Sequence, residues 1–138
     1  MLQFTKEVDY GIQLISALAK LDKGQLLSLH KFTDDANISF LFLQRIAKKL
    51  RMAGLIMSVK GAQGGYKLNK DFKKINVKEI VEALEGECAV SNCLKTGCGC
   101  GCGCNRADTC CSKKIFKAIN DKLMKFMEEM KVSEVIGN

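Results

Sequence analysis

All eight cysteines of the 138-residue chain lie between Cys88 and Cys111, in a stretch that includes an alternating Cys-Gly run and shows no apolar periodicity. A segment of this kind cannot bury a core by itself, so we expect a loop that becomes ordered only when something binds it. The core must come from the sequence on either side. The chain is therefore divided into residues 1–86, a cysteine-rich loop at 87–111, and a helix with a tail at 112–138.

Residues 1–54 carry the apolar spacing of three amphipathic helices. The first is predicted over 6–21 with Thr5 as its N-cap. Ser28 can cap a second helix that ends near Ala36, and Ser39 can cap a third that ends at Gly54. Only a tight turn separates the second helix from the third, which is typical of a helix-turn-helix.

Two short apolar runs follow, at 55–60 and 66–69, and Gly61, Gly64 and Gly65 lie between them. This pattern predicts a β-hairpin with a glycine-rich tip. A fourth helix is predicted from Asn76, which can form a capping box with Glu79, to Gly86. The predicted fold is mainly α-helical: a winged helix-turn-helix domain, a cysteine-rich loop and a long C-terminal helix.

The basic residues of the chain, whose formal net charge is +7, concentrate between residues 44 and 74, where Asp71 is the single acid. Such a balance favours a polyanionic partner. No run of 18 apolar residues is present, so we expect a soluble, cytoplasmic protein that does not enter a membrane.

The predicted third helix and hairpin supply the candidate DNA contacts. Side chains near the N-terminal end of a recognition helix can reach base edges in the major groove, where Gln44 suits adenine and Arg45 suits guanine. Lys48 and Lys49 lie further along and suit phosphates. The same polar residues would also fit the solvated face of an amphipathic helix. The candidate residues are Ser39, Phe40, Phe42, Gln44, Arg45, Lys48 and Lys49 on the helix, and Ser58, Lys60, Gly61, Gln63, Gly64 and Tyr66 on the hairpin.

The last helix is predicted from Ser112 to about Lys131. Its apolar residues are spaced alternately by three and four positions and form a seam comprising Phe116, Ile119, Leu123, Phe126 and Met130. A seam of two heptads can pack either against the first helix of its own chain or against a partner chain.

The cysteine segment indicates metal chemistry, because thiolates are soft ligands for iron–sulfur clusters, zinc and copper(I). The alternating run from Cys98 to Cys104 would place its sulfurs on one side of an extended strand. The lone histidine, His30, is predicted on the second helix as a solvated side chain. No catalytic set of serine, histidine and acid and no phosphate-binding fingerprint is present, so we do not expect an enzyme.

Several motifs together resemble the IscR/NsrR-type family of winged-helix transcription regulators. They are Asp9-Tyr10, Ile38-Ser39, Phe42-Leu43, Ala53-Gly54-Leu55-Ile56, the wing Gly61-x-x-Gly64-Gly65-Tyr66-x-Leu68, and Glu82-Ala83-Leu84-Glu85-Gly86. The resemblance covers nearly the whole chain. It implies a homodimer that binds a pseudo-palindromic double-stranded DNA operator, with an iron–sulfur cluster, [2Fe–2S] or [4Fe–4S], held by three cysteines of each chain.

Matching the family's cysteine spacing implies Cys93, Cys104 and Cys110 as the cluster ligands. The chain departs from the pattern in its extra Cys98, Cys100 and Cys102, and in Lys113, which stands where some members have a ligating histidine. The fourth ligand is either Asp9, by analogy with nitric-oxide-sensing relatives, or Cys111. The function expected is a transcription regulator whose operator affinity follows the state of the cluster. The alternative is a thiol-rich zinc- or copper(I)-binding regulator or metal-buffering protein.

Overall fold

The computed structural model describes residues 3–95 and 109–137. Its N-terminal domain contains α1 (Lys6–Ala19), α2 (Leu29–Ala36), α3 (Phe40–Met52), the strands β1 (Ile56–Val59) and β2 (Gly65–Leu68), the short 3-10 helix η1 (Phe72–Lys74) and α4 (Val77–Glu85). A second 3-10 helix, η2 (Asn92–Leu94), precedes the long α5 (Cys111–Glu129) and the short α6 (Val132–Ile136). The mainly helical fold with one small hairpin agrees with the sequence prediction.

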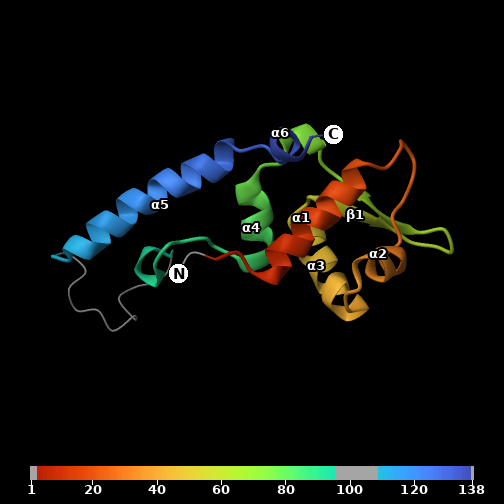
Figure 1. Cartoon of the computed structure of the whole chain (residues 1–138), viewed down its shortest axis with the longest axis horizontal. Coiled ribbons are helices and arrows are strands. Elements are labelled where there is room, and N and C mark those ends of the chain that lie inside the picture. The colour runs from red at the N-terminus through yellow and green to blue at the C-terminus, as the bar shows by residue number, and fades with distance from the viewer. Residues whose placement is uncertain (1–2, 96–108, 138) are drawn as a thin grey trace.

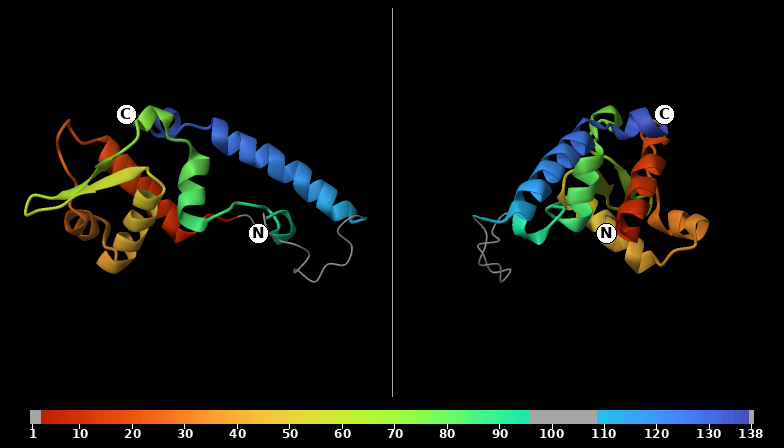
Figure 2. Two further views of the ribbon diagram at one scale, coloured as in Figure 1. Left: turned by 180° about the vertical axis from the view of Figure 1, so that it is seen from behind. Right: turned by 60° about the vertical axis from the view of Figure 1, so that its left-hand side comes forward.

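The hairpin and helices α2 and α3 occupy one end of the molecule, and the start of α5 lies at the other (Figure 1). Helices α1 and α4 stand between the two ends, as the views from behind and from the side also show (Figure 2). Any communication between the cysteine segment and the helix-turn-helix must therefore cross α1 and α4.

The core is formed by the apolar faces of the four N-terminal helices and β1. Leu14, Ile15, Leu43, Ile46 and Leu50 are fully buried in it. Full burial of an aliphatic side chain contributes about 1.5–3 kcal/mol. Helices α1 and α4 approach closely at Gly11, where an added Cβ would lie 2.3 Å from a methyl group of Leu84. Their mutual position is thus tightly determined.

Most predicted helix ends are confirmed, and the exceptions in α1 and α3 differ by one or two residues. Thr5 caps α1, the capping box of Asn76 and Glu79 is present, and Gly86 is the C-cap of α4. Helix α1 stops at Ala19 rather than Leu21, and Ala53 rather than Gly54 is the C-cap of α3. Gly54 follows with a φ of 78°. It therefore makes the turn that leads the chain into β1.

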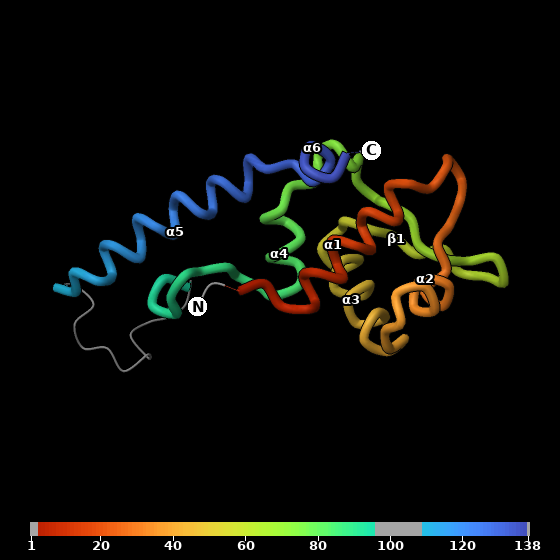
Figure 3. The backbone as a smooth tube through the Cα atoms, in the orientation of Figure 1, coloured from red at the N-terminus to blue at the C-terminus, as the bar shows by residue number. Residues whose placement is uncertain are grey.

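Helix α5 runs from Cys111 to Glu129, one residue earlier at its start and about two residues shorter at its end than predicted. The following backbone leaves the helix because it pairs with the segment before α4. The Val77 amide donates to the Met130 carbonyl at 3.1 Å, and the Val132 amide donates to the Ile75 carbonyl at 3.0 Å. The tube in Figure 3 shows α6 beside this segment. The C-terminal end of α5 is thereby fixed to the N-terminal domain. No helix in residues 3–95 and 109–137 is both long and apolar enough to cross a bilayer.

Glu79 is at once the capping-box residue of α4 and the ion-pair partner of Lys70. Burial alone raises the pKa of Glu79, but the hydrogen bonds from Lys70 and the Asn76 amide and the charges of Lys70 and Lys131 outweigh it. The pKa of Glu79 is consequently lower than usual. The charged form therefore stabilises the fold above the unfolded-state pKa, and this contribution is lost as the pH falls through the folded-state pKa.

We expect Glu79→Gln to lower the free energy of unfolding by about 1 kcal/mol at neutral pH, because glutamine keeps the cap but removes the charge near the helix N-terminus. Thermal unfolding followed by circular dichroism between pH 7 and pH 3 measures this. The difference between wild type and variant should shrink in acid. Asp34→Asn, at an exposed acid of α2, is the control. A difference that persisted at pH 3 would exclude the carboxylate as its source.

Candidate nucleic-acid interface and cysteine segment

Helix α3 buries one face and presents a basic one. Leu43, Ile46, Ala47 and Leu50 are fully buried, whereas Gln44, Arg45 and Lys48 are exposed. The last three are spaced as neighbours on one side of a helix. Ser39 occupies the N-cap position but makes no side-chain hydrogen bond to the helix. The predicted polar residues Gln44, Arg45 and Lys48 are thus available to a partner.

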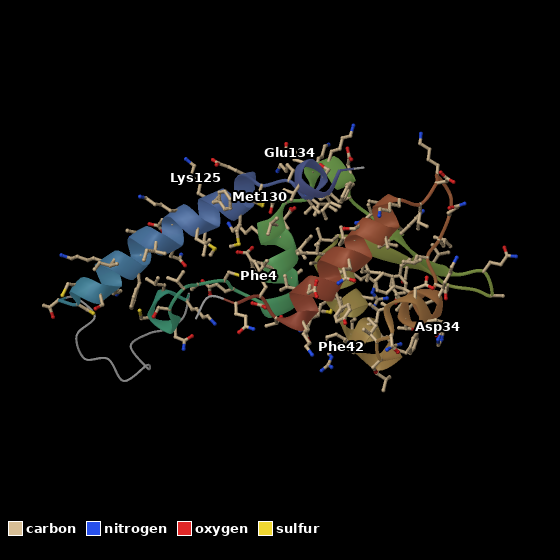
Figure 4. All side chains as sticks on the ribbon, viewed as in Figure 1. Phe4, Asp34, Phe42, Lys125, Met130 and Glu134 are labelled. Carbon is tan, nitrogen blue, oxygen red and sulfur yellow. The ribbon has the colours of Figure 1, made fainter. Side chains whose placement is uncertain are left out.

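The two aromatic candidates of α3 are half-buried instead of projecting freely. The ring of Phe40 stacks on His30 with centroids 4.0 Å apart, and Phe42 meets Tyr10 edge to face at 5.8 Å. The Arg45 guanidinium lies over the Phe42 ring, 5.7 Å from its centroid. Phe42 is labelled beside α3 in Figure 4. These contacts indicate that Phe40 and Phe42 position the start of α3 against α1 and α2.

The side chain of Lys49 has partners that the sequence did not indicate. Its ammonium donates to the Glu7 carboxylate at 2.5 Å and to the Leu84 carbonyl at 2.9 Å, so α3 is joined to the start of α1 and the end of α4. The side chains of Lys49 and Glu7 are 37% and 22% exposed. The ammonium that was predicted to contact a phosphate is thus engaged within the protein in this structure. Long-range pairs of this kind leave no local signal in a sequence.

The predicted wing is present as the antiparallel pair β1 and β2, with Ile56 opposite Leu68 and Val59 opposite Gly65. Gly61 has a φ of 126°, and a Cβ on Gly64 would lie 2.3 Å from the Val59 carbonyl oxygen. The tip therefore requires glycine at both positions. Lys60, Gly61 and Gln63 are exposed. The tip can accordingly approach a nucleic-acid backbone closely.

Hydrogen bonds fix the wing at two places, one on the segment before α2 and one on α3. The Tyr66 and Leu27 backbones exchange two hydrogen bonds of 2.9 Å, and the Tyr66 side chain is half-buried against the core. The Arg51 guanidinium donates to the Ser58 hydroxyl at 3.4 Å and links α3 with β1. Ser58 and Tyr66, predicted as DNA contacts, thus also hold the wing, Ser58 against α3 and Tyr66 against the segment before α2.

The cysteine segment begins where α4 ends. Cys88, Cys93 and Cys110 are half-buried, Cys111 is exposed, and all four are free thiols. Cys93 belongs to η2, and its sulfur lies 3.2 Å from the Ser91 hydroxyl. The Val90 amide donates to the Asn120 side chain of α5 at 3.1 Å. Cys110 is the N-cap residue of α5, and Cys111 is its first residue. The segment carrying Cys93 therefore packs against the helix that Cys110 begins.

The remaining cysteines, Cys98, Cys100, Cys102 and Cys104, lie outside the described residues, so one of the three implied ligands has no described position. Within residues 3–95 and 109–137, no three side chains of the metal-binding types His, Cys, Asp and Glu are grouped as a site. Asp9 is exposed on α1 and accepts a hydrogen bond from Gln13 at 3.0 Å. The described residues of a single chain therefore do not bring Cys93, Cys110 and Asp9 together into one site.

The surroundings of Cys88 disfavour ionisation of its thiol. Burial and the negative charges of Glu82 and Glu85 raise the pKa of the Cys88 thiol. A raised pKa disfavours the thiolate, the form that binds metal. Cys88 is thus poorly suited to act as the first ligand of the segment.

Helix α5 leaves much of its apolar seam uncovered. Phe116, Ile119 and Phe126 are 41%, 46% and 58% exposed, and Met127 is the buried contact of the helix with the domain. A cavity of about 620 Å³ lies between the N-terminal residues, α4, the segment after it and α5. Phe4, Val81, Cys88 and Met124 are among its lining residues, and Figure 4 labels Phe4 beside the end of α4. In the single chain α5 packs chiefly on α4 and η2, so α1 is not the main partner of the seam.

Comparisons of the sequence and of the structure with known proteins lead to transcription regulators. Residues 4–138 match the Rrf2 family, described as an iron-dependent transcriptional regulator. The HTH-type transcriptional regulator IscR of Escherichia coli is 26% identical over 138 residues, which cover 99% of this chain and 82% of that protein. The structure of CymR, the global cysteine regulator of B. subtilis, superposes with a TM-score of 0.74 at 24% identity, covering 98% of this chain and 96% of the other. IscR of T. potens gives a TM-score of 0.70 at 23% identity, covering 98% and 86%.

Proposed function

This chain belongs to the Rrf2 family of transcription regulators, and from that premise we propose that it binds a pseudo-palindromic operator as a homodimer under the control of an iron–sulfur cluster. It is a DNA-binding regulator and not an enzyme. The observation that carries the proposal is the exposed basic face of α3 beside a glycine-tipped wing. We place its action in the cytoplasm, where free thiols persist and DNA is accessible.

In the proposed complex, α3 enters the major groove and the wing follows the neighbouring backbone or minor groove. Gln44 and Arg45 contact base edges, while Lys48 and the wing residue Lys60 contact phosphates. The fixed contacts of Phe40 and Phe42 support this role, since they hold the first turn of α3 in place. Specificity would then reside in α3, and the wing would add affinity that does not depend on sequence.

We expect Gln44→Ala to reduce discrimination at one operator position by about 1–3 kcal/mol, because a bidentate contact to a base is lost. Lys48→Ala is the matched control one turn along the helix, and it should weaken operator and random duplexes by similar factors. Fluorescence anisotropy titrations on both duplexes, at one salt concentration, measure the two effects. Equal losses on both duplexes for Gln44→Ala would remove Gln44 from base recognition.

The donor set available in the cysteine segment fits an iron–sulfur cluster chemically, because Cys93 and Cys110 are free, partly accessible thiols on packed elements. We propose Cys93, Cys104 and Cys110 as ligands, with Asp9 of the partner subunit or Cys111 as the fourth. When bound, such a cluster supplies a centre that responds to oxidation or to nitric oxide. The residues around it would then be ordered or released according to its state.

Dimerisation is proposed through α5, whose exposed Phe116, Ile119 and Phe126 need an apolar partner. A second α5 packed on this seam would cover these side chains and lie close to the cysteine segments of both chains. The spacing of the two α3 helices would be set by how each α5 is held on its own domain.

A route from the cysteine segment to α3 is provided by Lys49. The Thr5 amide donates to Glu85 at 3.2 Å, so the start of α1 is tied to the last turn of α4. Lys49 joins the same two elements to α3 through Glu7 and Leu84. Gly86 and Cys88 come immediately after α4 in the chain. A cluster that holds the cysteine segment would therefore also fix the position of the end of α4, and through Lys49 the position of α3. We propose this as the coupling between cluster state and DNA affinity.

The experiment that tests the function is anaerobic purification with iron, sulfide and zinc analysis, followed by selection of bound duplexes from a random pool. Stoichiometric iron and sulfide together with an enriched symmetric sequence are expected. A colourless protein that carries only zinc would overturn the cluster and favour the zinc-binding alternative. Failure to enrich any sequence would overturn operator recognition, whichever metal is present.

A further inference from the structure

Leu41 is the large apolar side chain that the first turn of α3 leaves in solvent. It is 73% exposed, whereas its neighbours Phe40 and Phe42 are half-buried and packed against the core. Leu41 is therefore not part of the core of the described residues, and it is not among the proposed DNA contacts.

The position of Leu41 on the helix connects it with the proposed DNA contacts. Gln44, Arg45 and Lys48 follow it by three, four and seven residues, so all four side chains line one face of α3. Helix α3 contains no acidic residue. Leu41 is therefore the apolar element, nearest the N-terminal end, of a face that is otherwise polar and basic.

The first turn holds Leu41 in a defined direction. Phe40 is stacked on His30 of α2 with an angle of 3° between the rings, and Phe42 contacts Tyr10 of α1 at 87°. These two contacts flank Leu41 on either side in the sequence. A helix turn anchored in this way can present its exposed side chain to a partner without losing much conformational entropy on binding.

In the major groove, the apolar group that a base edge offers is the C5-methyl of thymine. Residues near the N-terminus of a recognition helix are the ones that reach base edges. We propose that Leu41 is a specificity-determining residue that packs against a thymine methyl next to the bases contacted by Gln44 and Arg45. This inference rests on the proposed function, since it requires α3 to enter the major groove.

The test replaces single thymines of the selected operator by deoxyuridine, which removes the methyl and keeps the base pairing. For the wild type, at least one such replacement should weaken binding about fourfold. This factor corresponds to the free energy of burying one methyl-sized group. Leu41→Ala should bind the thymine and deoxyuridine duplexes equally. Met52→Ala is the matched control, because Met52 is 77% exposed on the same helix but at its far end. It should keep the fourfold discrimination.

The possible failures are distinguishable. If the wild type enriches no sequence, the proposed function fails and the inference falls with it. If an operator is found but the wild type ignores every thymine methyl, or Leu41→Ala still discriminates, only the role of Leu41 is refuted. A Leu41→Ala variant with unchanged DNA selectivity and altered sedimentation would make Leu41 a protein-contact residue. Circular dichroism checks that both alanine variants are folded.

Discussion

Cys110→Ala is expected to abolish the visible absorbance of the anaerobically purified protein and to lower its operator affinity about 30-fold. Cys110 is the N-cap residue of α5, and in the proposed ligand set it joins the cysteine segment to the dimerising helix. Its loss would remove the link that the proposed cluster makes between the cysteine segment and α5, and the spacing of the two α3 helices would no longer be fixed. The expected factor lies inside the usual range of coupling between sites. Absorbance, iron content and operator titration on the same preparation measure it.

Cys88→Ala is the matched control for this prediction. Cys88 lies in the same segment and is a half-buried free thiol like Cys110, but its raised pKa disfavours the thiolate form. The variant should therefore keep the cluster and bind the operator within about twofold of wild type. If Cys88→Ala bleached the protein while Cys110→Ala left it coloured, the proposed ligand set would be wrong. If both variants kept full iron and sulfide, the cluster would be held by other cysteines.

The helix-turn-helix could be predicted because its signals are local. Apolar spacing identifies the buried face of α3, and the capping box at Asn76 and Glu79 identifies the start of α4. The end of α5 could not be predicted in the same way. Met130 continues the apolar seam in the sequence, yet its carbonyl accepts a hydrogen bond from Val77. A tertiary contact, and not helix propensity, ends the helix.

The candidate DNA face was predictable in part. Periodicity alone separates exposed Gln44, Arg45 and Lys48 from the buried face, and it would also have found Leu41, which shares their face. It could not separate Lys48 from Lys49, because the partners of Lys49 lie 42 and 35 residues away in the chain. The cluster ligands are harder still. In the proposed set, Cys104 lies outside the described residues, and Asp9 would come from a partner subunit.

Lys49→Met is expected to lower the free energy of unfolding by about 2 kcal/mol and to weaken the dependence of operator affinity on cluster state. Methionine replaces the aliphatic stem of Lys49 with an apolar chain of similar length, so the main loss is the ammonium. Without it, the half-buried Glu7 carboxylate and the Leu84 carbonyl lose their partner, and an unsatisfied polar group costs about 1–3 kcal/mol. Urea unfolding measures the stability. Operator titrations before and after cluster removal measure the coupling.

Lys48→Met controls for loss of one positive charge from α3, since Lys48 is exposed and has no hydrogen bond or ion pair to another residue within 3–95 and 109–137. It should lower DNA affinity for both cluster states alike and leave unfolding unchanged. Adding Glu7→Gln to Lys49→Met removes the unpaired carboxylate and should recover part of the stability, but not the coupling, because Leu84 still lacks its donor. If Lys49→Met kept the full ratio of affinities with and without cluster, the route through α4 would be excluded. A stability loss alone would leave Lys49 as a structural link between α1, α3 and α4.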